Sequence, residues 1–349
     1  MIKKFYITTA IAYTNASPHI GHALEFIQAD VLARYHRNKN EDVFFLTGAD
    51  EHGQKIYEAA KKRGKSPQEF VDEVSVEFKS LCQKLEISND YFIRTTDKEK
   101  HWPGVANLWE KIAENGDLEK RKYQGLYCVG CEEFKTKKVL IDGNKCPIHL
   151  KEVEIVEEEN WFFKLSKYSQ TLKEKINSGE LNIVPESRKN EILSLLNEGL
   201  EDISFSRPKE KLSWGIPVPG DESQIIYVWC DALTNYITGI GYGSNSNELF
   251  DKFWPADIHL IGKDILRFHA AIWPAMLLSA KLPTPKTIMT HGFITSNGHK
   301  MSKSLGNVIS PFELIEKYNA EAVRYYLLKE IPTLDDGDLT EEKLKERYN

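Results

Sequence analysis

The sequence lacks any long hydrophobic run. Its most apolar later stretch, residues 270–280, contains Pro274 and falls well short of the roughly 20 residues that a membrane-spanning helix needs. Residues 1–7 also lack the apolar core and the cleavage site of a signal peptide. We therefore expect a cytoplasmic protein that has no membrane partner.

An excess of basic residues is missing as well. The formal net charge of −6 argues against a general nucleic-acid coat protein, although a local basic stripe can still bind nucleic acid. Hydrophobic residues make up 41% and charged residues 28% of the chain, which is an ordinary globular balance. A chain of 349 residues of this composition predicts two or three domains.

Cysteine is scarce, with five residues in all, but three of them are clustered. Cys128 and Cys131 form a C-x2-C pair, and after fourteen intervening residues Cys146 and His149 form a C-x2-H pair. Two such knuckles can present three thiolates and one imidazole tetrahedrally to zinc, and four protein ligands leave no open position. In a cytosolic chain this spacing favours a structural zinc site over disulfides. The alternative is a group of reduced cysteines near a surface histidine.

The beginning of the chain has the pattern of a βαβ unit. Residues 5–9 are a β-rich run, a loop follows over residues 10–18, and apolar positions then recur at helical spacing from Ile20. Residues 42–47 are apolar without alternation, as in a parallel strand that is covered on both faces. This arrangement predicts a doubly wound nucleotide-binding fold.

Later segments extend this prediction. Residues 225–229 are a further β-rich run and residues 258–262 a further apolar run, after which a helix is expected from about Lys263. We predict an α/β protein with a Rossmann-type parallel sheet that is split by an inserted zinc-binding lobe and followed by a helical segment. The expected boundaries are residues 1–116 for the first half of the sheet domain, 117–212 for the inserted lobe, 213–299 for the second half, and 300–349 for the C-terminal segment.

Two short motifs suggest phosphate chemistry. The first, Pro18-His19-Ile20-Gly21-His22, opens the first helix, where unpaired N–H groups and the helix dipole attract phosphate. His19 and His22 share one face and can donate to phosphate oxygens, while Gly21 lets a nucleotide approach the backbone. Two histidines that merely cap an exposed helix end, or a metal-binding pair, are the alternatives.

The second motif, Lys300-Met301-Ser302-Lys303-Ser304, follows a turn at Asn297-Gly298. Lys300 and Lys303 on such a loop suit a triphosphate whose leaving pyrophosphate gains charge. A solvated basic loop is the alternative interpretation.

The two motifs together, in this order, resemble the HIGH and KMSKS signatures of class I aminoacyl-tRNA synthetases. Over essentially the whole chain the sequence resembles the bacterial methionyl-tRNA synthetase family. The matching segments are residues 12–22, 47–53, 125–128, 227–232, 260–265 and 291–293. A zinc knuckle in the inserted lobe also belongs to that family.

The resemblance implies a methionine pocket and an ATP site. Asp50 matches the carboxylate that receives the substrate ammonium, and the Ile11 carbonyl lies at the other ammonium contact. The positions that match the pocket around the thioether are Trp229, Ala232, Leu233, Tyr236, His269 and Trp273. The positions that match the ATP site are His19, Gly21, His22, Gly262, Asp264, Ile294, Lys300 and Lys303. Without the resemblance, Trp229, Tyr236 and Trp273 would be interpreted as ordinary core aromatic residues.

The resemblance further implies the activity. Methionine would be adenylated with ATP and Mg²⁺, with His19, His22, Lys300 and Lys303 as catalytic groups, and then transferred to tRNA(Met). Family members usually continue into a helical anticodon-binding domain, whereas this sequence stops at Asn349. Anticodon recognition is therefore not expected from these residues, and a cut at a domain junction is the favoured interpretation. We expect a monomer.

Three other classes of protein compete with this interpretation. A cysteinyl enzyme would have its zinc in the amino-acid site, whereas here the ligand cluster lies in the inserted lobe. A non-catalytic tRNA-binding paralogue could lose a signature histidine or lysine, yet all are present. A nucleotidyltransferase shares histidine-rich phosphate sites, but the methionine-pocket matches and the zinc lobe count against it.

Overall fold

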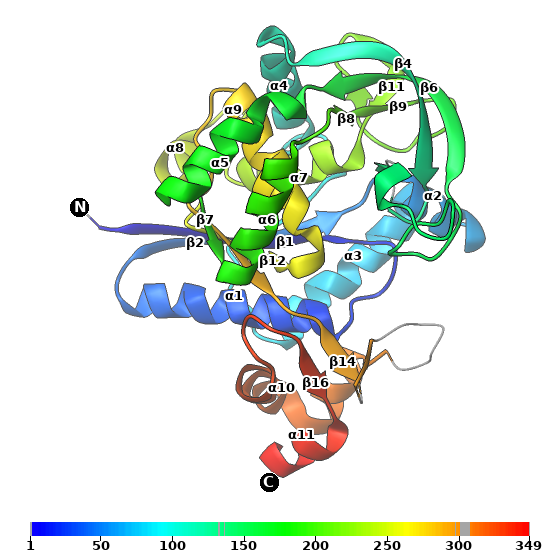
Figure 1. The fold of residues 1–349 in the computed structure, drawn as a ribbon. Coiled ribbons are helices and arrows are strands. Elements are labelled where there is room, and N and C mark those ends of the chain that lie inside the picture. The colour runs from blue at the N-terminus through cyan, green and yellow to red at the C-terminus, as the bar shows by residue number, and fades with distance from the viewer. Residues whose placement is uncertain (1, 132, 136, 297, 301–307, 349) are drawn as a thin grey trace.

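The computed structural model describes residues 2–131, 133–135, 137–296, 298–300 and 308–348, and of Glu133, Lys138 and Lys300 only the backbone. At its centre is a six-stranded parallel sheet in the order β3-β2-β1-β12-β13-β7 (Figure 1). The strands are β1 (Lys4–Tyr13), β2 (Asp42–Asp50), β3 (Tyr91–Arg94), β7 (Asn182–Val184), β12 (Ile258–Gly262) and β13 (Thr287–His291). The predicted parallel α/β fold is confirmed.

The order of this sheet reverses between β1 and β12. From β1 the chain proceeds outward through β2 and β3, whereas β12 and β13 lie on the opposite side of β1. In open α/β sheets, ligands bind at the carboxyl ends of the strands at such a switch point. We therefore expect a ligand site at the carboxyl ends of β1, β2, β12 and β13.

Helices cover both faces of the sheet. Figure 1 shows α1 and α3 on one side, and α5, α6, α7 and α9 on the other. The helices that come first along the chain are α1 (Ile20–Asn38), α2 (Gln54–Lys62), α3 (Pro67–Lys84) and α4 (Trp102–Glu114). They are followed by α5 (Ser169–Ser178), α6 (Glu186–Glu198), α7 (Val228–Thr238), α8 (Glu248–Phe253) and α9 (Trp273–Ser279). Two large apolar clusters form the core: one includes residues of α4, α5, α6, α7 and α9, and the other includes residues of α1, α2 and α3.

Two local predictions differ from the structure. β1 continues to Tyr13 instead of ending at Thr9, because residues 11–13 pair with the end of β2 up to Asp50. The apolar run 225–229 is not one strand: β11 ends at Ile226, and α7 begins at Val228. Nearly all of α7 is buried, so its sequence has no polar face to distinguish it from a buried strand. The helix predicted from about Lys263 is confirmed: a 3₁₀ turn (Lys263–Ile265) and a π-helical stretch (Phe268–Ile272) lead into α9.

A second, antiparallel sheet arises within the range expected for the inserted lobe. Its order is β5-β4-β6-β8, from β4 (Leu118–Cys128), β5 (Glu133–Lys135), β6 (Glu154–Phe163) and β8 (Ile203–Ser204). The same range also supplies β7 to the edge of the parallel sheet. A smaller sheet has the order β10-β11-β9. Its strands are β9 (Ser206–Pro208), β10 (Pro217–Val218) and β11 (Asp221–Ile226).

The C-terminal part forms a separate layer next to α1 (Figure 1). β14 (Ile294–Ser296) pairs with β15 (His299–Lys300) and with β16 (Gly337–Leu339). Two helices complete it, α10 (Pro311–Glu330) and α11 (Glu341–Tyr348), and α10 is interrupted by non-helical dihedral angles at Asn319. In the described part of the chain, no helix combines the length and the apolar composition needed to cross a membrane.

Candidate active site and metal centre

A cavity of about 530 Å³ opens at the carboxyl ends of the central strands. Its wall includes Ile11 of β1, Asp50 of β2, Gly262 of β12 and His291 of β13. Parallel strands end at one edge of a sheet, so residues that are up to 280 positions apart in sequence meet here. The cavity thus lies where the topology predicts a ligand.

Most of the predicted site residues line this one cavity. They are Ile11, His19, Gly21, His22, Asp50, Trp229, Ala232, Leu233, Tyr236, Gly262, Asp264, His269 and Ile294. Trp273 lies behind the wall, fully buried, with its ring 6.0 Å from that of Tyr236. Lys303 falls outside the described residues, and Lys300 is described only as part of β15.

The histidine pair opens α1 in a reciprocal capping arrangement. His19 is the N-cap residue, and its Nδ1 accepts the Gly21 N–H at 3.1 Å, while Nδ1 of His22 accepts the His19 N–H at 3.1 Å. Because both Nδ1 atoms accept, a neutral ring at either position carries its proton on Nε2. Burial, reinforced by His19 and His291, holds the pKa of His22 well below its usual value. His22 is therefore a neutral donor at physiological pH.

The other end of the cavity is aromatic and rigid. Trp229 stacks on Phe268 with a centroid separation of 3.6 Å and an interplanar angle of 9°. The Tyr236 hydroxyl lies 2.6 Å from Nε2 of His269, whose Nδ1 lies 2.9 Å from the Ile265 carbonyl. Burial lowers the pKa of His269 to about 4. The neutral imidazole thus donates from Nδ1 to the carbonyl and accepts the Tyr236 hydroxyl at Nε2.

Two residues at the floor of the cavity were not predicted. Glu25 of α1 accepts the Ala10 N–H at 2.8 Å and pairs with Nε2 of His291 at 2.9 Å, so it joins α1, β1 and β13. Although burial opposes it, this carboxylate raises the pKa of His291 above its usual value. The sequence did offer a signal for Glu25, because a glutamate stands there among the apolar positions of a helical pattern. Such a carboxylate is expected to be buried with a partner.

The inserted lobe contains a candidate metal centre. The ligand atoms of Cys128, Cys131, Cys146 and His149 all lie within 4.8 Å of one another. The His149 Nδ1 lies 3.4 Å from Cys131 Sγ, 3.8 Å from Cys146 Sγ and 3.9 Å from Cys128 Sγ, and the Cys131 and Cys146 sulfurs are 3.6 Å apart. A tetrahedral zinc site with usual bond lengths has edges of about 3.6–3.8 Å. The donor set and its dimensions fit a tetrahedral metal ion.

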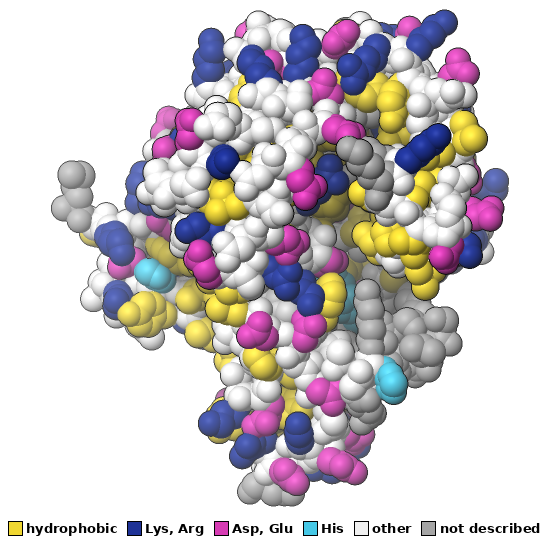
Figure 2. All heavy atoms as spheres, viewed as in Figure 1, with side chains coloured by type: hydrophobic (Ala, Val, Ile, Leu, Met, Phe, Trp, Pro, Cys, Tyr) yellow, Lys and Arg dark blue, Asp and Glu magenta, His cyan; other side chains and the backbone are white. Residues whose placement is uncertain are grey.

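The surroundings of this centre support the same assignment. A Cβ atom at Gly130 would lie 2.5 Å from the His149 ring, so glycine there leaves room for the imidazole. Among the residues that the structure describes here, a small apolar cluster around Cys128, Cys146 and Val153 underlies the loops. Several apolar side chains of the same segment are exposed, namely Val139, Ile141, Ile148, Leu150 and Ile155. Figure 2 shows hydrophobic side chains at the surface on the side of the molecule where β4 and β6 lie. A segment with so little core needs a metal or a partner to be stable.

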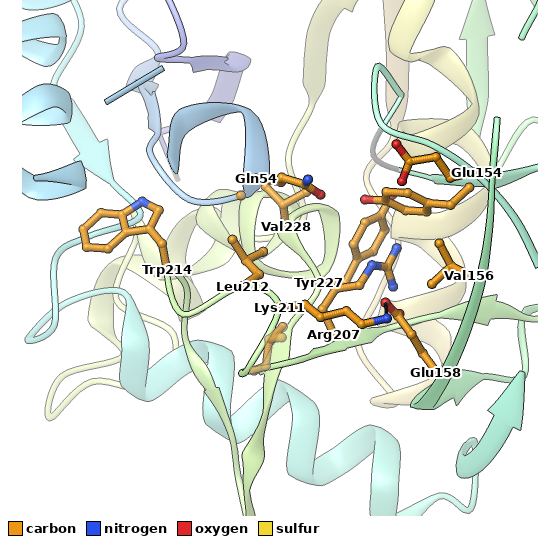
Figure 3. A pocket seen from close by; sticks show the side chains of 13 residues that line it. Gln54, Glu154, Val156, Glu158, Arg207, Lys211, Leu212, Trp214, Tyr227 and Val228 are labelled. Atoms are coloured by element: carbon orange, nitrogen blue, oxygen red, sulfur yellow. Dashed lines mark hydrogen bonds and ion pairs between the residues drawn. The ribbon is translucent and has the colours of Figure 1, made fainter. Parts of the chain in front are cut away.

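A second cavity of about 290 Å³ lies between β6 and the segment that precedes α7 (Figure 3). Glu154, Val156 and Glu158 form one wall, since alternate residues of a strand share a face. Arg207, only 7% exposed, faces them with its guanidinium 4.7 Å from the Tyr227 ring. Val228 lines both cavities, so the two are neighbours.

Comparison with known proteins assigns this architecture to a class. The family model described as "tRNA synthetases class I (M)" matches residues 5–154 and 138–349. The chain therefore belongs to the class I tRNA synthetases, in the branch that this model describes.

The relatives within this class are methionine enzymes. A methionine–tRNA ligase of Thermotoga maritima is 51% identical over 349 residues, which cover 99% of this chain and 55% of that protein. The methionyl-tRNA synthetase of Mycobacterium tuberculosis in complex with methionyl-adenylate superimposes with a TM-score of 0.95 at 43% identity, over 100% of this chain and 68% of that one. The apo form of that synthetase superimposes with a TM-score of 0.84 at 38% identity, over 99% of this chain and 66% of that one. The chain spans about half the length of several curated relatives that it matches.

Proposed function

We propose that this protein activates L-methionine with ATP to form methionyl-adenylate and transfers the methionyl group to the 3′-terminal adenosine of tRNA(Met). The observation that carries the proposal is the 530 Å³ cavity. It joins the histidine-capped start of α1 to an aromatic pocket, with the Asp50 carboxylate between them. One cavity thus offers donors for phosphate, an acceptor for an ammonium group, and an apolar site for a side chain.

Methionine would bind with its ammonium group at Asp50 and the Ile11 carbonyl. Its thioether would lie among Trp229, Ala232, Leu233, Tyr236 and His269, because sulfur makes favourable contacts with aromatic edges. Trp273 would support Tyr236 from behind. The hydroxyl of Tyr236 is already engaged by His269, so this wall presents a fixed shape to the side chain.

ATP would place its phosphates at the start of α1 and its adenosine along Gly262, Asp264 and the Ile294 backbone. The methionine carboxylate attacks the α-phosphate, and pyrophosphate leaves. No protein nucleophile is needed, because alignment and charge stabilisation supply the rate. His19 and His22 would donate from Nε2, Lys300 and Lys303 would hold the leaving pyrophosphate, and Mg²⁺ would accompany ATP.

The Cys128, Cys131, Cys146 and His149 centre would hold a structural zinc ion. Four protein ligands complete its coordination, so zinc would stabilise the fold of the lobe and not enter the reaction. The knuckle also touches the active site, since Cys131 and Ile148 line the main cavity. We propose that the lobe positions the acceptor end of tRNA there, that residues 117–212 act as this lobe between the two halves of the catalytic domain, and that the protein works as a monomer in the cytoplasm.

Amino-acid-dependent ATP–pyrophosphate exchange tests the first step. Methionine, cysteine, leucine and isoleucine are compared with no amino acid, using folded and zinc-replete protein. Exchange with methionine alone is expected, and exchange with another amino acid would contradict the proposed substrate. The Lys300→Ala variant is expected to lose adenylate formation far more than methionine binding.

A further inference from the structure

A buried polar network connects two parts of the main cavity from behind. Asp231 of α7 is 1% exposed, and its Oδ2 lies 2.6 Å from Nδ1 of His52. Its Oδ1 lies 2.7 Å from Nε2 of His101, at the start of α4. Asp231 is not among the described residues that line the cavity. The carboxylate therefore cannot be assigned to substrate contact and needs another explanation.

The sequence positions of the partners indicate what the network connects. His52 follows the Asp50 carboxylate by two residues, directly after β2 ends. Asp231 lies on α7, whose opposite face carries Trp229, Ala232, Leu233 and Tyr236 into the cavity wall. The bond between His52 and Asp231 thus joins the proposed ammonium site to the helix of the proposed thioether site. These two sites lie about 180 residues apart in sequence, and the His52–Asp231 bond itself spans 179 residues.

The geometry of the network makes it rigid. An ionised carboxylate only accepts hydrogen bonds, so His52 must donate from Nδ1 and His101 from Nε2. With each oxygen held by a different imidazole, the carboxylate cannot rotate. Burial alone would raise the pKa of Asp231, but the two histidines outweigh it and leave the pKa below its ordinary value. The charged, accepting form is therefore the stable one.

Two further contacts fix the histidines themselves. Nδ1 of His101 lies 2.7 Å from the Thr238 hydroxyl, at the far end of α7, so His101 contacts the helix at two points two turns apart. The ring of His52 packs edge-on against Trp214, whose Nε1 donates to the Glu51 carbonyl at 2.6 Å. The chain on the carboxyl side of Asp50 is thus held on both sides.

We infer that Asp231 is a positioning residue that, through His52, sets the distance between the Asp50 carboxylate and the side-chain pocket, and so selects for α-amino acids with a methionine-length side chain. The inference rests on the proposed function. A ligand that contacts both sites depends on their separation, whereas a ligand that contacts only one does not. This difference separates positioning from general stability.

The test uses Asp231→Asn and two ligands. The first is methionine, measured by its KM in pyrophosphate exchange, and the second is its analogue with hydrogen in place of the ammonium group, measured as a competitive inhibitor. An asparagine cannot accept from both histidines, so we expect the KM for methionine to rise about tenfold or more. The KM for ATP and the inhibition constant of the analogue should stay within about twofold of the wild-type values.

Asp117→Asn is the matched control. Asp117 is also 1% exposed and accepts from Lys167, Tyr168 and Ser279, but it is not among the described residues that line either cavity. It should leave the KM for methionine unchanged. Equal weakening of both ligands in Asp231→Asn, or an unchanged KM for methionine in folded protein, would overturn the inference.

If Asp231→Asn does not fold, a pair of His52 variants tests the positioning role instead. His52→Asn keeps an N–H donor near the position of Nδ1, whereas His52→Leu removes it. We expect His52→Asn to stay near the wild-type KM for methionine and His52→Leu to lose about tenfold. Equal effects of the two substitutions would overturn the inference. If the wild-type protein itself shows no methionine-dependent exchange, the proposed function fails instead.

Discussion

The rings of His19 and His22 stack with a centroid separation of 3.9 Å, while Nδ1 of each accepts a backbone N–H at the start of α1. This arrangement uses Nδ1 of each ring to cap the helix. Under the proposed function, the same two side chains would serve both helix capping and phosphate binding.

His22→Ala should slow adenylate formation by about 100-fold or more, the usual loss when one preorganised donor is removed from a developing charge. The KM for methionine should change little, because His22 lies at the proposed phosphate end. Single-turnover formation of methionyl-adenylate measures the rate. His36→Ala is the control, since His36 lies at the other end of α1, stacked on Phe5. A comparable loss in both variants would argue for helix destabilisation as the cause.

Acid should destabilise the protein through its buried histidines. The pKa of His269 is about 4 in the folded protein because of burial, against about 6.5 in the unfolded chain. The unfolded chain therefore binds the additional proton first, and the free energy of unfolding falls as pH drops from about 6.5 to about 4. The contribution is on the order of 3 kcal/mol. Urea unfolding of wild type and His269→Gln at pH 7.5, 6 and 5 measures it. The variant should lose less stability over this range than wild type, and identical pH dependence would contradict the assignment.

Gly130→Ala should weaken zinc binding without removing a ligand. The added methyl group would lie 2.5 Å from the His149 ring and displace the imidazole from its position. Misplacing one of four ligands should cost about 10- to 100-fold in affinity, comparable to other changes near metal ligands. Competition with a chromophoric chelator measures the affinity. Ile148→Ala, a neighbouring exposed position, should bind zinc like wild type. If Gly130→Ala also binds zinc like wild type, His149 is not a ligand.

Asp336→Ala should impair ATP binding selectively. Its carboxylate holds Lys263 Nζ at 2.7 Å and accepts the Phe293 N–H at 2.8 Å, and these residues adjoin Gly262 and Ile294 at the proposed adenosine end. We expect a several-fold rise in the KM for ATP and little change in the KM for methionine. Glu341→Ala is the control. It removes a carboxylate that pairs with Lys317 between α10 and α11, and it should change neither the KM for ATP nor the KM for methionine. A rise in the KM for methionine alone would place the adenosine elsewhere.

The Cys/His cluster and the two signature motifs could be recognised in the sequence because each is encoded locally. Cysteine and histidine spacing defines a possible tetrahedral site before folding, and the start of a helix after a strand is an anion site wherever it occurs. The apolar run at 225–229 was misassigned in part because a buried helix and a buried strand have the same composition. Glu25 and His291 were missed since they lie on α1 and β13, and only the sheet brings these elements together.

The sequence by itself therefore determined the class of fold, the cluster of cysteine and histidine residues, and the histidine pair that opens α1. These depend on residue types at short spacing, where chain geometry is fixed by helix and strand periodicity. Only the tertiary structure decided that Asp50, Tyr236 and His291 share one cavity, that Trp273 lies behind it, and that Asp231 holds His52. Such contacts depend on strand order and on long-range packing, which are properties of the whole folded chain and not of any one segment.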